Sequence, residues 1–427
     1  MIGYDSIEYA SLTDVGIRRS HNQDAHATLL AGDPEQWRQR GHIFLVADGM
    51  GAHAVGELAS ELAVSIIPHT YHKHAPQAGV AALRKAFVEA NASIHAKGQQ
   101  NPEFGGMGTT TTALLIRPEG AWVGHVGDSR AYRVRDGQIE QLSFDHSLVW
   151  EMARRQGVDP DLLEGIPSNV IIRSLGPEPL VQVDLEGPYP ARSGDIYILC
   201  SDGLSGQLSD SEIGAIASEL PPAEACQLLI DLANLRGGPD NITVLIARVN
   251  DRPSPSRIMA HQKKSFWQRL RPWPVPVLLA GLLFTGQAAY VWAYELRGLA
   301  IASFLVAVIA VVTGIVGLVL HYAAEKRRRA ADPDYPAPKV YRSAHCRIER
   351  DLIGKLAGAL ATLEQQLKDK QWEADWSTYQ QLRESGERLL AENRLSESLR
   401  QHGHAIHLLV EAVHRMRPKG EVFQPVW

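Results

Sequence analysis

The sequence "FLVADGMGAHAVGELAS" (residues 44–60) runs from four apolar residues directly into an acid, Asp48. Three glycines follow Asp48 within nine positions, and a helix-like pattern comes after them. The short apolar run is typical of a buried strand. A carboxylate at the end of such a strand is either a turn-former or a ligand, and the neighbouring glycines leave the backbone open to close approach.

Three further strand-like runs end or begin at an acid. "AWVGHVG" runs into Asp128, "DIYILCS" runs into Asp202, and "NITVLIARV" starts just after Asp240. A single strand-end aspartate is most often a turn residue, as we expect for Asp136 in the hairpin turn "VRDGQI". Four such acids, each beside or close to glycine, instead predict that carboxylates converge at one rim of a sheet.

Carboxylates that gather in one place repel one another and stay ionised only beside a cation. A site built from oxygen ligands suits Mg²⁺ or Mn²⁺. The segment "GIRRSHNQDA" (16–25) adds Arg19 and Asp24. A guanidinium near a divalent metal matches the oxygens of a phosphate group. The residues alone therefore predict a metal site that handles phosphate.

From about residue 8 to residue 249, the chain resembles the bacterial type 2C metal-dependent protein serine/threonine phosphatases. Seven pieces carry the resemblance in the family's order and spacing, and a single piece such as "SDG" would be unspecific. They are "GIRRSHNQDA", "VADGMGAHAVGELAS", "GMGTTTTALLI", "HVGDSRAYRV", "DHSLV", "SDGLSGQLSD" and "GGPDNITVLIARV".

The resemblance implies an α+β fold, an αββα sandwich of two antiparallel sheets flanked by helices. It also implies two Mn²⁺ or Mg²⁺ ions at the sheet rim, with a third position in bacterial members. Asp48 would bridge both ions and the carbonyl of Gly49 would bind the second. Asp202 and Asp240 would complete the first ion, and Asp128 with Asp202 would form the third position.

The same resemblance assigns the remaining roles. Arg19 would hold the substrate phosphate, and Asp24 would act through bound water. The implied reaction is hydrolysis of phosphoserine and phosphothreonine on proteins by a hydroxide that bridges the two metals. "GIPSNVIIRSLG" (165–176) would close the family's mobile flap near the substrate entrance. Phosphorylated proteins, serine/threonine kinases and their substrates are the implied partners.

The sequence departs from the family pattern at three positions. Gln23 stands where many relatives carry glutamate, and Ala52 replaces a glycine. Met50 stands where animal members carry a histidine proposed as the general acid, which leaves the proton donor open, with metal-bound water and His53 as candidates.

The alternative function is a catalytically weak, membrane-tethered sensor or scaffold that binds phosphoproteins. Loss of metal ligands would favour it, but Asp48, Asp202 and Asp240 are all present. A cysteine phosphatase needs arginine six positions after its cysteine, whereas the sixth residue after Cys346 is Leu352.

Two uncharged segments, Val275 to Tyr294 and Leu299 to Leu320, have 20 and 22 residues. About 20 helical residues span the hydrocarbon layer of a bilayer. Only "ELRG" separates the segments, so we expect a transmembrane hairpin, with a buried helical pair as the alternative. Basic residues flank both ends, which places both water-exposed parts in the cytoplasm of an inner-membrane, multi-pass protein. They are Lys263, Lys264, Arg269, Arg271 and Lys326 to Arg329.

The last part of the chain contains three amphipathic segments, with apolar residues every three or four positions from Ile348 onward. We expect them to pack on each other, bind a protein partner or self-associate. A helical bundle is preferred to a weak tetratricopeptide resemblance in "NRLSESLRQHGHAI". The predicted domains are a phosphatase domain (1–250), a basic linker (251–273), the hairpin (274–322), a basic, proline-rich linker (323–345) and a helical region (346–427).

The composition of the chain argues against several other classes of protein. A net charge of −5 without long single-sign blocks argues against nucleic-acid binding. The three cysteines are widely spaced, which favours a reducing compartment over a disulfide framework. The first ten residues lack the pattern of a cleavable signal peptide, so we expect none.

Overall fold

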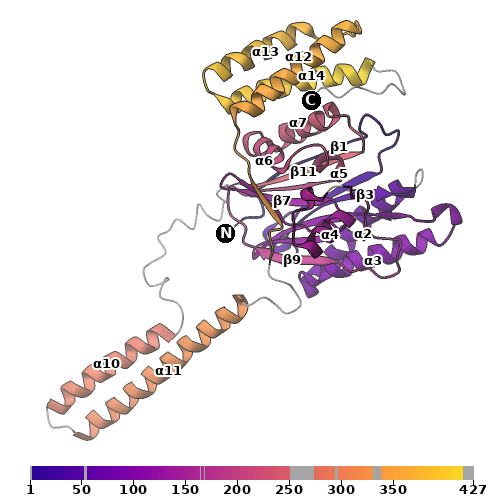
Figure 1. Cartoon of the computed structure of the whole chain (residues 1–427). Helices are drawn as coiled ribbons and strands as arrows, with labels where there is room; N and C mark the ends of the chain where they lie inside the picture. The colour runs from indigo at the N-terminus through magenta and orange to yellow at the C-terminus, as the bar shows by residue number, and fades with distance from the viewer. Residues whose placement is uncertain are drawn as a thin grey trace. The chain divides into compact units, whose positions relative to one another are not determined.

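The computed structural model describes residues 2–51, 55–163, 165–167, 169–250, 274–293, 297–329 and 338–416. The described chain forms two compact units (Figure 1). The first joins Met1–Arg252 with Pro338–Trp427, and the second is Pro253–Ala337. The predicted basic linker 251–273 and the candidate His53 lie outside the described residues.

The first unit contains two six-stranded antiparallel sheets. In one sheet the order is β1 (Ile7–Asp14), β11 (Ile242–Val249), β10 (Ile196–Cys200), β7 (Arg130–Arg135), β8 (Gln138–Gln141) and β12 (Arg342–His345). In the other it is β2 (Asp24–Leu29), β3 (His42–Met50), β5 (Thr111–Arg117), β6 (Gly120–Val126) and β9 (Asp184–Tyr189), with β4 (Gly108–Thr109) paired to β3. β7 and β8 form the hairpin expected around Asp136.

The two sheets pack face to face because their strands alternate. Leu199 and Leu245 belong to the apolar cluster between the sheets, together with Phe44 and Leu114 of the opposite sheet. Their strand neighbours, such as Ile246, belong to a second cluster on the outer face. Alternate side chains of one strand therefore enter the two different clusters, and the strand is buried on both faces.

Helices cover the outer faces. α2 (Val55–Ala78) and α3 (Ala81–Gly98) lie over the sheet that contains β3, and α6 (Asp210–Glu219) and α7 (Pro222–Leu235) lie over the sheet that contains β11 (Figure 1). The expected αββα sandwich is confirmed. Short elements complete the unit: α1 (Pro34–Gln39), η1 (Pro102–Phe104), α4 (Leu148–Gln156), η2 (Pro160–Leu162) and α5 (Asp202–Ser205).

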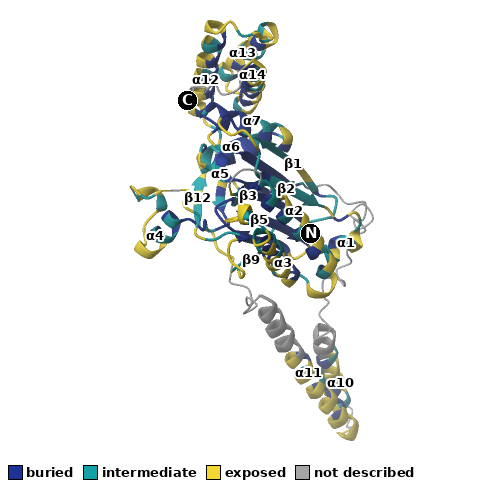
Figure 2. Ribbon diagram, turned by 90° about the vertical axis from the view of Figure 1, so that its right-hand side faces the viewer, coloured by how far each residue is buried: buried dark blue, intermediate teal, exposed yellow. Residues whose placement is uncertain are grey.

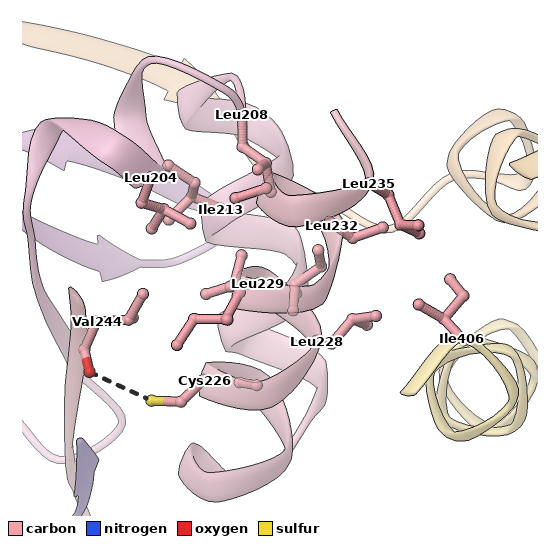
Figure 3. Close-up of a cluster of buried hydrophobic side chains, with 14 of the residues drawn as sticks. Leu204, Leu208, Ile213, Cys226, Leu228, Leu229, Leu232, Leu235, Val244 and Ile406 are labelled. Carbon is pink, nitrogen blue, oxygen red and sulfur yellow. Dashed lines mark hydrogen bonds between the residues drawn. The ribbon is translucent and has the colours of Figure 1, made fainter. Parts of the chain in front are cut away.

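The C-terminal helices are α12 (Arg350–Asp369), α13 (Trp376–Ala391) and α14 (Leu395–Met416). The buried residues of α12 and α14 join the same apolar cluster as α7 (Figure 2). Figure 3 shows Ile406 of α14 facing Leu228 of α7 across this contact. The helices therefore pack on each other and on the sandwich of their own chain, and β12 extends its sheet from within the segment predicted as a linker.

The second unit is a pair of helices, α10 (Pro274–Ala293) and α11 (Arg297–Arg329). A Cβ on Gly281 would lie 2.7 Å from a Val311 side-chain carbon, so α10 and α11 approach closely at this glycine. Among the described residues, one helix, Arg297–Val316, is long and apolar enough to cross a membrane. The two-helix transmembrane hairpin stays a prediction.

Candidate metal centre

Asp24 and Asp48 meet at the junction of the two sheets. Asp24 begins β2 and is the direct cross-strand partner of Asp48 in β3. The hydroxyls of Ser201 and Thr243 each donate a hydrogen bond of 2.7 Å to Oδ2 of Asp24. Ser201 directly follows β10 and Thr243 lies in β11, so these two bonds connect Asp24 of one sheet to the edge of the other sheet.

The main chain around Asp48 is fixed on both sides of its α-carbon. Its N–H donates to Oγ1 of Thr110 at 3.0 Å, and its carbonyl accepts from the Thr110 N–H at 2.8 Å. The next N–H, on Gly49, donates to the carbonyl of Gln23 at 3.0 Å. With these bonds made by the backbone, the carboxylate of Asp48 is free to face the other acids.

The other three strand-end acids reach the same place from different elements. Asp202 is the first residue of α5, with one residue between it and the end of β10. Asp128 follows β6, and Asp240 precedes β11. Asp24, Asp202, Asp128 and Asp240 all act electrostatically on Asp48. The structure thus brings together all five predicted acids.

Gathering these acids away from water raises their pKa values. Burial, opposed in part by the hydrogen bonds from Ser201 and Thr243, raises the pKa of Asp24 to about 7. Burial, followed by the charges of its acidic neighbours, raises the pKa of Asp48 well above its usual range. The pKa of Asp128 rises well above its usual range and that of Asp202 also rises, in both cases chiefly through burial. Such shifts are typical of acids gathered where a cation would stabilise their ionised forms.

The donor set fits a hard divalent cation. Oδ1 of Asp24, Oδ1 of Asp128 and Oδ1 of Asp202 are buried and have no hydrogen-bond partner among the described residues. Buried polar atoms are normally satisfied, so three unsatisfied carboxylate oxygens in one cluster need a ligand. Carboxylate oxygens are what Mg²⁺ and Mn²⁺ prefer.

Arg19 lies at the edge of this cluster. Its guanidinium donates to Oδ2 of Asp240 at 2.7 Å, and the Arg19 and Asp240 side chains are 46% and 32% exposed. No three His, Cys, Asp or Glu side chains in the described ranges form a ready-made cage around one point.

Four polar residues that support the centre were not singled out from the sequence. Thr110, Ser201 and Thr243 hold Asp48 and Asp24 as described above. The amide of Asn241 donates to the carbonyls of Val15 and His21 and thereby fixes the loop that carries Arg19. All four residues lie in the motifs "GMGTTTTALLI", "SDGLSGQLSD" and "GGPDNITVLIARV", so their closeness in sequence to the strand-end acids was the signal that could have identified them.

A cavity of about 310 Å³ opens beside Asp128 and Asp202. Its other wall is part of residues 147–175, which we call the flap because they include the segment predicted to close one. The flap contains α4 and η2 and leaves and rejoins the domain through a bridge between Ser147 and Ile171. Trp150, Asp161 and Ile166 of the flap line the cavity.

The chain is similar to characterised bacterial proteins over its first unit. Residues 17–223 match the family model of protein phosphatase 2C. Serine/threonine protein phosphatase PstP of Mycobacterium tuberculosis is 36% identical over 248 residues, which are 57% of this chain and 45% of that relative. Protein phosphatase PhpP of Streptococcus pneumoniae is 36% identical over 57% of this chain and 98% of its own length. The chain thus spans less than half of PstP and nearly all of PhpP.

The chain is also similar to solved structures of bacterial serine/threonine phosphatases. A crystal structure of M. tuberculosis PstP covers 57% of this chain and 99% of its own, with a TM-score of 0.51 and 35% identity. The serine/threonine phosphatase of S. agalactiae covers 57% and 100%, with a TM-score of 0.51 and 33% identity. A further structure is described as the catalytic domain of PstP in complex with two manganese ions, with a TM-score of 0.49.

Proposed function

Since the chain belongs to the protein phosphatase 2C family, we propose that it hydrolyses phosphoserine and phosphothreonine on proteins with Mn²⁺ or Mg²⁺. The observation that carries this proposal is the cluster of buried aspartates with unpartnered oxygens at the rim of the two sheets. PstP and PhpP, which are named as protein phosphatases, support the same activity. The scaffold alternative predicts lost metal ligands, whereas all of them remain.

The proposed roles follow the positions of the side chains. Asp48, Asp202, Asp240 and the carbonyl of Gly49 would hold two divalent ions, and Asp128 with Asp202 would hold a third. Such ions, when bound, lower the pKa of water toward neutrality and neutralise phosphoryl charge.

The remaining roles belong to side chains around these ligands. Arg19, which is half-exposed beside Asp240, would bind and orient the phosphate with its planar fork. Asp24, whose Oδ2 accepts hydrogen bonds from the Ser201 and Thr243 hydroxyls, would act through bound water next to the metal ligands. Met50 lies in β3 beside this centre and its thioether carries no proton to donate, so the proton donor to the leaving group is left open.

The experiment that tests this function uses the full chain in detergent micelles, since the C-terminal helices share a core with the sandwich. Turnover of a phosphothreonine peptide should require Mn²⁺ and stop when EDTA is added. Binding of the peptide without Mn²⁺-dependent release of phosphate would instead establish the scaffold function.

The pKa shifts predict how metal binding depends on pH. In the metal-free protein the pKa of Asp24 is about 7, above the value of an unfolded aspartate, so its ionisation costs folding free energy. Metal-free stability from this group is therefore lost as the pH rises toward about 7, and a bound cation offsets that loss. We expect the increase in Tm caused by saturating Mn²⁺ to be larger at about pH 8 than at about pH 6. Thermal unfolding with EDTA or Mn²⁺ measures it, and equal increases at both pH values would contradict it.

We further propose that α10 and α11 form the predicted membrane hairpin, with both water-exposed parts in the cytoplasm. Along α11 the small residues Ala300, Ser303 and Ala307 are buried, which suits close packing on α10. The large apolar residues around them are exposed, including Phe304 and Ile309. An apolar surface of this kind is favourable in lipid and costly in water.

The membrane proposal predicts that the full chain stays in the membrane pellet after alkaline carbonate extraction, because an inserted hairpin is held by burial of apolar surface rather than by charge. A variant lacking residues 274–329 should appear in the supernatant. Release of the full chain by carbonate would rule out the hairpin.

A further inference from the structure

The segment that follows the second unit lies directly on the phosphatase sandwich. The carbonyl of Lys339 accepts from the hydroxyl of Tyr189 at 2.7 Å, and the Tyr341 hydroxyl donates to Glu186. The Tyr341 N–H then donates to the carbonyl of Gln141 at 2.9 Å, where β12 begins to pair with β8. Residues 342–345 therefore extend the sheet at its β8 edge, and Lys339 and Tyr341 also contact β9 of the other sheet.

From this strand, Arg342 reaches the flap. Its guanidinium forms an ion pair with Asp161 and lies 3.8 Å from a carboxylate oxygen of Asp159. It also lies over the ring of Trp150, 5.9 Å from the ring centroid. Because Asp159 caps η2, Asp161 lies within η2 and Trp150 belongs to α4, one side chain contacts both helical elements of the flap.

Trp150 links this contact to the acid cluster. The guanidinium of Arg130 lies 5.7 Å from the centroid of the same ring, and Arg130 donates to Asp145 at 2.8 Å. Arg130 and Asp145 line the cavity together with Asp128. The flap wall that Arg342 holds is therefore the wall that faces the metal ligands.

We propose that Arg342 is a positioning residue for the phosphatase reaction, which holds the flap at the distance from the acid cluster that a phosphoprotein substrate requires. The proposal rests on the proposed phosphatase function. The side chains of Arg342 and Asp161 are 23% and 68% exposed, and partly exposed ion pairs add little to global stability. What this pair does instead is restrict a wall of the cavity, and geometry of that kind controls rate and binding.

Hydrolysis of a substrate that contacts the cavity wall beyond its phosphate group should depend on Arg342, whereas hydrolysis of a small substrate should not. In the full chain with Mn²⁺, Arg342→Ala should lower kcat/KM for a phosphothreonine peptide by about tenfold, mainly through KM. Hydrolysis of p-nitrophenyl phosphate should change by less than about twofold, because that substrate makes few contacts beyond the phosphate. Arg342→Lys keeps the charge for Asp161 but loses the planar contact with Trp150, and should give an intermediate value.

The matched control is Arg400→Ala. This change removes an ion pair between α14 and α7, Arg400 with Glu224 at 2.5 Å, on the same C-terminal region but on elements away from the flap. It should leave the peptide KM unchanged. Hydrogen exchange supplies a readout that needs no activity, since amides of residues 148–163 should exchange faster in Arg342→Ala and not in Arg400→Ala.

The outcomes separate the two proposals. An active wild-type protein whose Arg342→Ala variant keeps its peptide KM and its flap exchange would overturn the positioning role. Equal losses for the peptide and the small substrate would also overturn it, because they would indicate general disruption. A wild-type protein without Mn²⁺-dependent activity would overturn the proposed function, while the exchange experiment would still decide whether Arg342 restrains the flap.

Discussion

Replacing Asp48 by asparagine is expected to lower Mn²⁺-dependent phosphatase activity by about 1,000-fold or more, because a metal ion supplies several kcal/mol of charge stabilisation. Asp48 lies at the centre of the acid cluster, and four other aspartates act on it electrostatically. Asparagine keeps the shape of the side chain but removes the negative charge. The loss should therefore appear in kcat for both a phosphopeptide and p-nitrophenyl phosphate.

The same substitution should not destabilise the metal-free protein. Burial and acidic neighbours raise the pKa of Asp48, so at neutral pH its ionised form costs folding free energy. Asparagine removes that cost, and the Tm measured in EDTA should stay equal to or above that of the wild type. The increase in Tm with Mn²⁺ should shrink at the same time.

A matched control is available at the β7–β8 turn. Asp136 has a φ of 53°, a left-handed conformation that asparagine also adopts readily. Asp136→Asn should retain activity, metal response and stability. Full activity in Asp48→Asn would exclude a metal site at Asp48, and a large fall in its metal-free Tm would assign Asp48 a structural role instead.

Several strands could be predicted because they carry their own signals, whereas their arrangement as a sandwich was what the family resemblance implied. β3, β10 and β11 are short apolar runs whose ends are marked by acids and glycines, and their alternating side chains fill two cores. The site residues could be predicted for the same reason, since Asp48, Asp128, Asp202 and Asp240 stand where those strands end. The roles assigned to them as ligands stay predictions.

What the sequence could not provide was the long-range pairing. β12 consists of "RSAH", which lacks an alternating apolar pattern, and it becomes a strand because β8 offers an open edge. The contact between Ile406 and Leu228 likewise joins two helices that are far apart in the chain. The sequence predicted an apolar stripe on the last helix, but an apolar stripe does not identify the surface against which the helix packs.

Arg19 shows a different limit. Its predicted role as the phosphate ligand stays a prediction, and the sequence did not indicate that its guanidinium pairs with Asp240. That pairing depends on the loop fixed by Asn241, whose amide bonds are set by the meeting of two distant segments. An arginine with a nearby acid satisfies its charge locally, so residue type alone does not give its partner.

Replacing Gly49 by alanine is the second change with a large expected effect. A Cβ at this position would lie 2.1 Å from the carbonyl oxygen of Gly56 and 2.6 Å from that of Gln23. Both contacts are with backbone, so relief requires that the end of β3, the start of α2 or the segment before β2 move. We expect a loss of about 3 kcal/mol in the free energy of unfolding, the upper end of the usual cost of overpacking, because backbone must shift.

Gly49→Ala should lose its phosphatase activity even where the protein still folds, because the backbone atoms that must move also position the acid cluster. Gly49 follows Asp48, and its N–H holds the carbonyl of the residue before Asp24. Any shift that admits the methyl group therefore separates the two acids, and Mn²⁺-dependent turnover should become undetectable even where the protein remains folded. Gly354→Ala is the control: its Cβ would meet nothing within 4 Å on helix α12, where alanine gains about 1 kcal/mol over glycine. Chemical denaturation and the phosphopeptide assay measure both effects, and a fully active Gly49→Ala would show that the backbone at residue 49 has room the structure does not contain.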